Sequence, residues 1–310
     1  MNTDFCYPDG KRYYTFDSFL KHKFGCKIAK ITLNGGFTCP NRDGSKAYGG
    51  CIYCSDKLSG DFAGDPDTSI AEQFAKGKKL MAGKWKNVRY MPYFQAGTGT
   101  YAPIERLRAL YEAALAQEDV VALSIATRPD SIAPEVYDLL SELAKRTFLT
   151  VELGLQSVSD RTGERINRKT DYAEFLTCFS ELKDREIAVC VHLINGLPGE
   201  TREDMLESVK TVSALDPWAI KLHLLHVLRG TVCESMYRNG EFRTLEKDEY
   251  VSLVCDELEY ISPGIVMQRL TGDGARADLI APLWSLKKFE LLNAIDKEMA
   301  RRGSSQGMRT

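Results

Sequence analysis

The chain has no long apolar run. None of its segments approaches the roughly 18 to 20 consecutive apolar residues that cross a bilayer. Its first residues, MNTDFCYPDGKRYY, lack the apolar centre of a signal peptide. We therefore expect a cytoplasmic protein without membrane association.

Neither sign of charge dominates, because 41 Lys and Arg residues face 43 Asp and Glu residues, for a net charge of -2. Overall charge therefore gives no support for nucleic-acid binding, although it leaves a local basic face open. Internal repeats and low-complexity segments are also absent, which excludes a solenoid. With 310 residues and 44% hydrophobic content, the chain can form one large domain with an extension.

Histidine is scarce, with four residues, whereas cysteine occurs nine times. An odd number of cysteines in a chain of this size argues against a disulfide framework, so we expect free thiols or metal ligands. Three of them lie in apolar helical or strand patterns typical of buried, inert thiols: Cys178, Cys190 and Cys255. The assignment of Cys6, Cys26 and Cys233 stays open.

Short β-branched apolar runs alternate with amphipathic segments. Strands are predicted at 28–33, 88–95, 120–126, 148–153, 187–194 and 219–225. Helices are predicted at 68–81, 103–116, 134–144, 172–183 and 202–214, and Thr201 ahead of two acidic residues is a helix-start signal. The alternation indicates βαβ units with a parallel sheet, either a full or partial barrel or an open doubly wound sheet.

Glycine-rich or polar segments follow the predicted strands: AGTGTYAP, TRPD, GLQS and NGLPGE. Ligands bind at this end of the strands in both barrels and open α/β sheets. Beyond about residue 229 the regular alternation of predicted strands and helices changes. A helix at 245–260, a short strand at 265–270 and a final helix near 286–299 are predicted there.

Cys39, Cys51 and Cys54 follow the first predicted strand in the stretch CPNRDGSKAYGGCIYC. Three cysteines can hold a four-iron cluster with one iron left open, whereas a structural zinc ion usually takes four ligands. A redox dithiol formed by Cys51 and Cys54 is a third interpretation. Cys26 is a candidate fourth ligand, but an apolar run separates it from Cys39. The spacing alone does not decide between these sites.

Seven stretches, in order and mostly after predicted strands, carry a resemblance: FGCKIAKITLNGGFTCPNRDGSKAYGGCIYC, TRPD, VELGLQS, NRKT, GLPGE, HLLHVLRGT and QRLTGDG. From about Phe24 to about Trp284 the chain resembles radical S-adenosylmethionine (radical SAM) enzymes of the YhcC/YtqA type, which are related to the radical domain of the Elongator catalytic subunit. One departure is that eleven residues separate Cys39 from Cys51, where most radical SAM enzymes have three. Ala126 also stands where some relatives have a glutamate.

The resemblance implies an α/β fold, a partial TIM-type (β/α)6 barrel. We expect an N-terminal extension at residues 1–27, the barrel at 28–230 and a C-terminal extension over the barrel at 231–310. It also implies that Cys39, Cys51 and Cys54 bind a 4Fe-4S cluster. SAM would chelate the open iron and would be cleaved reductively to give a 5′-deoxyadenosyl radical.

The same resemblance implies residues that bind SAM: Gly97, Thr98, Glu152, Gln156, Arg168 and His192. Arg269 and Asp273 in QRLTGDG are candidates to close over the substrate, and His223 and His226 are candidates for adenine or substrate contact. For His192, His223 and His226 simple packing is the alternative, and for Arg168 it is a solvated helix charge. The basic stretch 76–89 around Trp85 is either an RNA contact or a solvated helix end.

The implied function is modification of a wobble uridine side chain in tRNA, with electrons from a donor such as flavodoxin or ferredoxin. A radical SAM enzyme that acts on a small molecule or a protein is one alternative. A zinc-stabilised binding module without catalysis is another.

Overall fold

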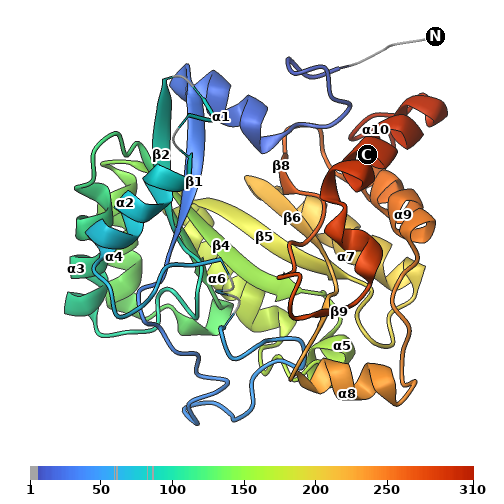
Figure 1. Cartoon of the computed structure of the whole chain (residues 1–310), viewed down its shortest axis with the longest axis horizontal. Helices are drawn as coiled ribbons and strands as arrows, with labels where there is room; N and C mark the ends of the chain where they lie inside the picture. Colours follow the sequence, from blue (N-terminus) through green and yellow to red (C-terminus); the bar gives the residue numbers. More distant parts are fainter. Residues whose placement is uncertain (1–5, 59, 61, 82, 86) are drawn as a thin grey trace.

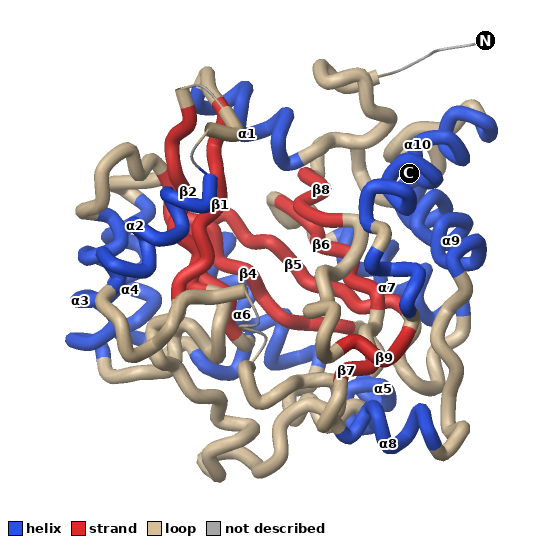
Figure 2. Tube along the Cα trace, viewed as in Figure 1, coloured by secondary structure: helices blue, strands red, loops and turns tan. Residues whose placement is uncertain are grey.

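The computed structural model describes residues 6–58, 60, 62–81, 83–85 and 87–310. Seven parallel strands form a curled sheet with helices on its outer face, which confirms the predicted partial barrel (Figures 1 and 2). The sheet order is β1-β2-β3-β4-β5-β6-β8. Its strands are β1 (Lys27–Leu33), β2 (Val88–Phe94), β3 (Ala122–Thr127), β4 (Phe148–Gln156), β5 (Ala188–Asn195), β6 (Ala219–Leu224) and β8 (Val266–Arg269). A separate antiparallel pair is formed by β7 (Val227–Leu228) and β9 (Leu279–Ala281).

The helices between the strands lie where the periodicity predicts them. They are α2 (Ile70–Met81), α3 (Ile104–Leu115), α4 (Pro134–Ala144), α6 (Tyr172–Asp184) and α7 (Arg202–Ala214). Thr201 is the N-cap of α7, and its side chain and that of Asp204 form a reciprocal capping box. The further helices are α1 (Phe16–Phe24), α5 (Asp160–Arg165), α8 (Val232–Arg238), α9 (Lys247–Tyr260), α10 (Lys288–Arg302) and two 3-10 turns, Pro129–Ser131 and Leu283–Leu286. Within the described residues, none of the helices has the length and apolar character needed to cross a bilayer.

The short strand predicted at 265–270 belongs to the main sheet. It forms β8, which pairs in parallel with β6, so the sheet has seven strands instead of six. Because β1 and β8 are the two edge strands, the barrel is open on one side. This opening places side chains of β1 opposite side chains of β8.

Helix α1 lies at the N-terminal ends of the strands. Its Phe19 ring contacts Trp218 and Phe148, with ring centroids 5.1 and 5.6 Å apart, and Phe16 lies 6.0 Å from Trp218. Such edge-to-face and tilted aromatic contacts stabilise beyond simple burial. Because apolar packing fills this end, a ligand site is expected at the C-terminal ends of the strands.

Helix α9 carries a buried carboxyl group that packs against the end of β5. Asn195 donates a hydrogen bond to Glu257 at 2.9 Å, and burial raises the pKa of Glu257 to about 8. The folded protein therefore holds a proton that the unfolded chain releases near its ordinary pKa of 4.5. The stability from this group is fully present below pH 4.5 and is lost as the pH rises through 8.

We expect Glu257→Gln to remove this pH dependence, because glutamine is neutral throughout. Relative to the natural chain, the variant gains stability as the pH rises between 4.5 and 8, by up to about 1.4 kcal/mol per pH unit. Urea unfolding across that range measures the difference. Two stability curves that run parallel would contradict the assignment.

Candidate functional site

A cavity of about 290 Å³, here called the cluster cavity, lies at the C-terminal ends of the strands. Cys39, Cys51 and Cys54 line it from the loop between β1 and α2. Most of the other predicted site residues also line it: Gly97, Thr98, Glu152, Gln156, His192, Arg269 and Asp273, together with His223 and His226. Arg168 does not line it. The fold thus brings residues from far apart in the sequence into one space.

Backbone hydrogen bonds hold the cysteine loop. The Cys54 amide donates to the Cys51 carbonyl at 3.0 Å, which closes a tight turn. Between these cysteines, Ile52 donates to Ile166 at 3.0 Å and accepts from Cys233 at 2.9 Å. In the described part of the chain, no three His, Cys, Asp or Glu side chains converge as ligands of one metal ion. The thiols instead face a common space, as a cluster requires, because each cysteine then binds a different iron.

The surroundings of Cys51 combine burial with a nearby cation. Burial raises the pKa of the Cys51 thiol, whereas the charge of Arg128 lowers it. Asp130 holds Arg128 in place through two hydrogen bonds, of 2.9 and 2.7 Å, and the Asn41 amide lies 3.7 Å from the Cys51 sulfur. Because iron binds the thiolate, Arg128 favours the form that binds.

Gly97 and Thr98 connect the end of β2 to the cysteine loop. Their amides donate to the carbonyls of Leu58 and Thr38, both at 3.0 Å. Gly97 has a φ of 72°, and a Cβ there would lie 2.4 Å from the carbonyl oxygen of Phe37. Only glycine therefore allows this close approach of loop and strand.

Arg168 lies behind the wall of the cluster cavity and contacts the backbone of that wall. It is 2% exposed, and its guanidinium donates to the carbonyls of Leu155 and Ser157 on either side of Gln156. Gln156 has a φ of 66° beside a register shift in the β4–β5 pairing. Because Arg168 is buried, the alternative of a solvated charge is wrong. Arg168 also does not line the cluster cavity, so its direct contact with SAM stays a prediction. We infer instead that Arg168 positions Gln156.

Arg168→Lys should destabilise the protein by about 2 kcal/mol, because one ammonium cannot replace a planar fork that serves several buried carbonyls. Urea unfolding measures this loss. A spectroscopic titration of SAM should show weaker binding, and Gln156→Ala should weaken it without a comparable loss of stability. Unchanged stability in Arg168→Lys would rule out the positioning role.

Inside the barrel, a polar network is centred on Glu152, which is fully buried on β4. Its carboxylate accepts hydrogen bonds from Lys30 of β1, Ser124 of β3, His192 of β5 and Lys221 of β6. Burial raises the pKa of Glu152, but the charges of Lys221 and Lys30 and the hydrogen bond from His192 outweigh it and hold this pKa well below its ordinary range. The expectation that a buried Glu152 needs partners is confirmed. Lys30 and Lys221 were missed, although each lies between two apolar residues of a strand.

Three histidines on the cavity wall are neutral near pH 7. Burial lowers the pKa of His192 to about 4 and that of His226 to about 4, and it places that of His223 well below its ordinary value. The rings of His192 and His223 lie 5.1 Å apart. The Nε2 atoms of His223 and His226 have no hydrogen-bond partner among the described residues, so they are available to a ligand.

The TGDG segment after β8 wraps around His226. A Cβ at Gly272 or at Gly274 would lie 3.0 Å from the His226 ring. In the same segment, Asp273 forms an ion pair with Arg269 at 3.1 Å. The glycines therefore allow the Asp273 loop to close over the cavity edge.

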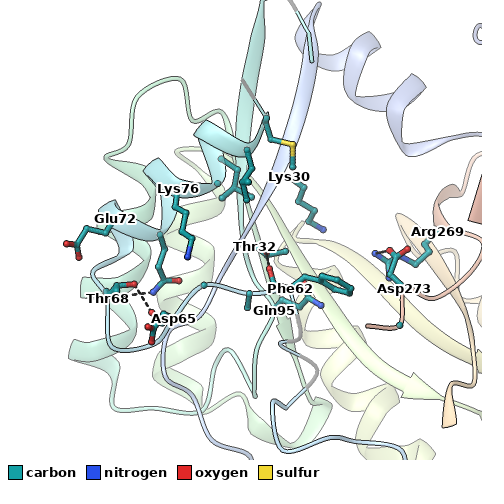
Figure 3. Close-up of a pocket in the computed structure, with 18 of the residues that line it drawn as sticks. Lys30, Thr32, Phe62, Asp65, Thr68, Glu72, Lys76, Gln95, Arg269 and Asp273 are labelled. Carbon is teal, nitrogen blue, oxygen red and sulfur yellow. Dashed lines mark hydrogen bonds and ion pairs between the residues drawn. The ribbon is translucent and has the colours of Figure 1, made fainter. Parts of the chain in front are cut away.

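A second cavity of about 710 Å³, here called the lateral cavity, lies on the open side of the barrel (Figure 3). It is lined by β1, the segment before α2, α2 itself, β8 and the segment before α10. Phe62, Gln95, Arg269 and Asp273 line both cavities. Arg269 and Asp273 therefore lie at the border between the two cavities.

The basic stretch 76–89 is described only in part, because residues 82 and 86 lie outside the described residues. Trp85 is 44% exposed, and the Lys27 ammonium lies 5.0 Å from its ring centroid. Lys78 forms an ion pair with Glu118 at 2.7 Å. The possible RNA contact of this stretch stays a prediction.

The residues of the cluster cavity fit an iron–sulfur cluster with SAM. Three thiols line one space, the charge of Arg128 favours the thiolate of Cys51, and unpaired histidine nitrogens and a glycine-shaped strand end lie beside them. A single zinc ion finds no three converging ligands among the described residues, and it gives no role to the rest of the lining.

Comparison with known proteins supports this interpretation. The Radical SAM superfamily model matches residues 38–212, and the Radical SAM C-terminal domain model matches residues 217–301. YtqA of Bacillus subtilis is 48% identical over 308 residues, covering 99% of this chain and 96% of YtqA. YhcC of Escherichia coli is 35% identical, covering 93% of this chain and 92% of YhcC.

More distant relatives share part of the chain. A tRNA uridine(34) acetyltransferase of Methanocaldococcus infernus is 25% identical, covering 61% of this chain but only 35% of that protein. Among solved structures, the archaeal Elp3 of the same organism has the same fold, with a TM-score of 0.69 at 18% identity, and the match covers 90% of this chain and 64% of Elp3. On the family models and the close relatives, the chain belongs to the radical SAM superfamily and is an enzyme that uses a 4Fe-4S cluster and SAM.

Proposed function

We propose that this radical SAM enzyme modifies the side chain of a wobble uridine in tRNA. The observation that carries the proposal is that the two cavities share four lining residues, and at this border a substrate outside the barrel would approach the cluster cavity. The identity of the substrate is supported by the tRNA uridine(34) acetyltransferase relatives and by the Elp3 fold.

In this proposal Cys39, Cys51 and Cys54 hold the cluster. When bound, the cluster and SAM supply a carbon-centred radical by reductive cleavage of the sulfonium. Apolar packing at the other end of the barrel closes that end to water, so that solvent and substrate reach the cavity from the C-terminal ends of the strands. Flavodoxin or ferredoxin is the class of electron donor that we propose.

The remaining lining residues orient SAM and the substrate. Gly97 and Thr98 shape the wall beside the cysteine loop, and Gln156 and His192 present polar atoms to SAM. Glu152 accepts a hydrogen bond from His192 at 2.9 Å and so fixes its ring. Arg269 and Asp273, at the junction, contact the substrate.

Profiling of modified nucleosides by mass spectrometry tests the substrate. In tRNA from a strain that lacks this protein, one wobble-uridine derivative should disappear and its precursor should accumulate. The purified enzyme with SAM and a reductant should convert that precursor in the isolated tRNA. An unchanged nucleoside profile would exclude tRNA and favour a small-molecule or protein substrate.

A further inference from the structure

The inner wall of the lateral cavity carries three basic side chains, Lys30, Arg269 and Lys288, and one carboxylate, Asp273. Behind this wall, Glu152 is shared by the ammonium groups of Lys30 and Lys221, and neither Glu152 nor Lys221 lines the lateral cavity. Asp273 is shared by Arg269, at 3.1 Å, and by Lys288, at 2.8 Å. Two carboxylates, Glu152 and Asp273, thus form ion pairs with four basic side chains.

Solvent screens Lys288, whose side chain is 37% exposed, but it reaches the other three basic groups less, because they lie partly or wholly inside the barrel. The side chains of Lys221, Lys30 and Arg269 are 6%, 20% and 29% exposed. Lys221 and Arg269 are register partners across β6 and β8, so two positive side chains are neighbours. A buried charge is costly unless it is paired.

Neighbouring titratable groups leave the excess in place. His192 is neutral near pH 7, and burial lowers the pKa of Lys30 to about 8, so Lys30 stays largely protonated there. Asp65 and Glu72 line the outer wall together with Lys76, but all three are exposed. Solvent and salt screen them from the inner wall.

The position of Lys30 distinguishes an anion site in the lateral cavity from the SAM site in the cluster cavity. Lys30 lines the lateral cavity but not the cluster cavity, whereas Arg269 lines both. Figure 3 shows Lys30 on the β1 side of the pocket, and Arg269 with Asp273 on the opposite side. A group bound between Lys30 and Arg269 would therefore belong to the substrate and not to SAM.

We propose that the lateral cavity binds an anionic group of the substrate, a carboxylate or a phosphate, between Lys30 and Arg269. The inference deepens the proposed function and rests on it only in assigning the anion to tRNA. Lys30 supplies a point charge, and the Arg269 guanidinium supplies a planar pair of donors that suits either anion.

The test uses the reconstituted holoenzyme saturated with SAM. Sodium phosphate or sodium acetate replaces chloride at constant ionic strength, and the melting temperature is measured. At an anion concentration about ten times the Kd, we expect a rise of about 3 °C in the natural chain. Lys30→Met and Arg269→Gln should lose the rise, whereas Lys76→Met, an exposed lysine of the same cavity, should keep it.

Lys30→Arg keeps the charge and should keep the rise, so it provides a folded variant if Lys30→Met does not fold. The proposal is overturned if neither anion raises the melting temperature, if Lys30→Met responds like the natural chain, or if saturating SAM abolishes a rise that is seen without SAM. The larger of the two shifts tells whether the site prefers phosphate or carboxylate.

A second arm separates this inference from the proposed function. Unmodified tRNA from the deletion strain should bind Lys30→Met about tenfold more weakly than the natural chain. If small anions bind at Lys30 and the tRNA does not bind, the anion site stands and the tRNA substrate fails. If tRNA binds both proteins equally and no anion shifts the melting temperature, the anion site fails and the tRNA substrate stands.

Discussion

Replacing Cys39, Cys51 or Cys54 by alanine should lower the rate of reductive SAM cleavage by at least about 10³-fold. Loss of a residue that only supports a metal ligand already costs about 10- to 100-fold in metal affinity or activity, and loss of the ligand itself should cost more. Each variant removes one of the three thiols that line the cluster cavity, so the cluster is no longer held. After anaerobic reconstitution the natural chain should be brown with about four irons, and the variants should be nearly colourless. Iron analysis, absorbance near about 400 nm and methionine release under dithionite measure the three effects.

Cys6→Ala and Cys26→Ala are the matched controls. Cys6 is exposed and Cys26 is half-buried, and neither lines the cluster cavity. Both variants should keep the colour, the iron content and SAM cleavage of the natural chain. Loss of the cluster in Cys26→Ala would make that thiol a fourth ligand and would contradict a site with an open iron. Full SAM cleavage by Cys51→Ala would remove the proposed cluster ligands altogether.

The sheet and its helices follow from local patterns in the sequence. Apolar runs such as 219–225 mark strands that are buried on both faces, and caps such as Thr201 mark helix starts. An apolar run and a helix cap each lie within a few residues of the strand or helix that they predict. The cysteine loop is readable for the same reason, because its three thiols and its glycines lie in one stretch.

The polar contacts inside the barrel depend on the register between strands and on the curling of the sheet. Neither can be predicted from the residues of one strand. Lys30 in IAKITL and Lys221 in AIKLHL each interrupt an apolar strand, but nothing in either strand shows that both reach Glu152. The backbone contacts of Arg168 could not be predicted for a related reason. In NRKT, Arg168 reads as a surface charge or a ligand contact, whereas the turn after α5 directs it to backbone carbonyls beside Gln156.

Glu152→Ala should destabilise the protein by about 3–5 kcal/mol, the usual cost of removing one partner from a buried ion pair. The variant leaves Lys30 and Lys221 without their shared carboxylate in a space from which water is largely excluded. It also removes the acceptor for His192 and Ser124. Urea unfolding of the natural chain and of the variant measures the loss.

Two further variants separate charge from packing. Glu152→Gln keeps the shape and some hydrogen bonds but not the charge, so a large loss of stability in this variant assigns the effect to unpaired lysines. Adding Lys30→Met to Glu152→Gln should then recover part of that loss, because one of the two unpaired cations disappears. Glu142→Gln, which breaks an exposed ion pair with Arg108, should change stability little. If Glu152→Gln were as mild as Glu142→Gln, the cationic excess would not be buried, and the anion site proposed for the lateral cavity would lose its physical basis.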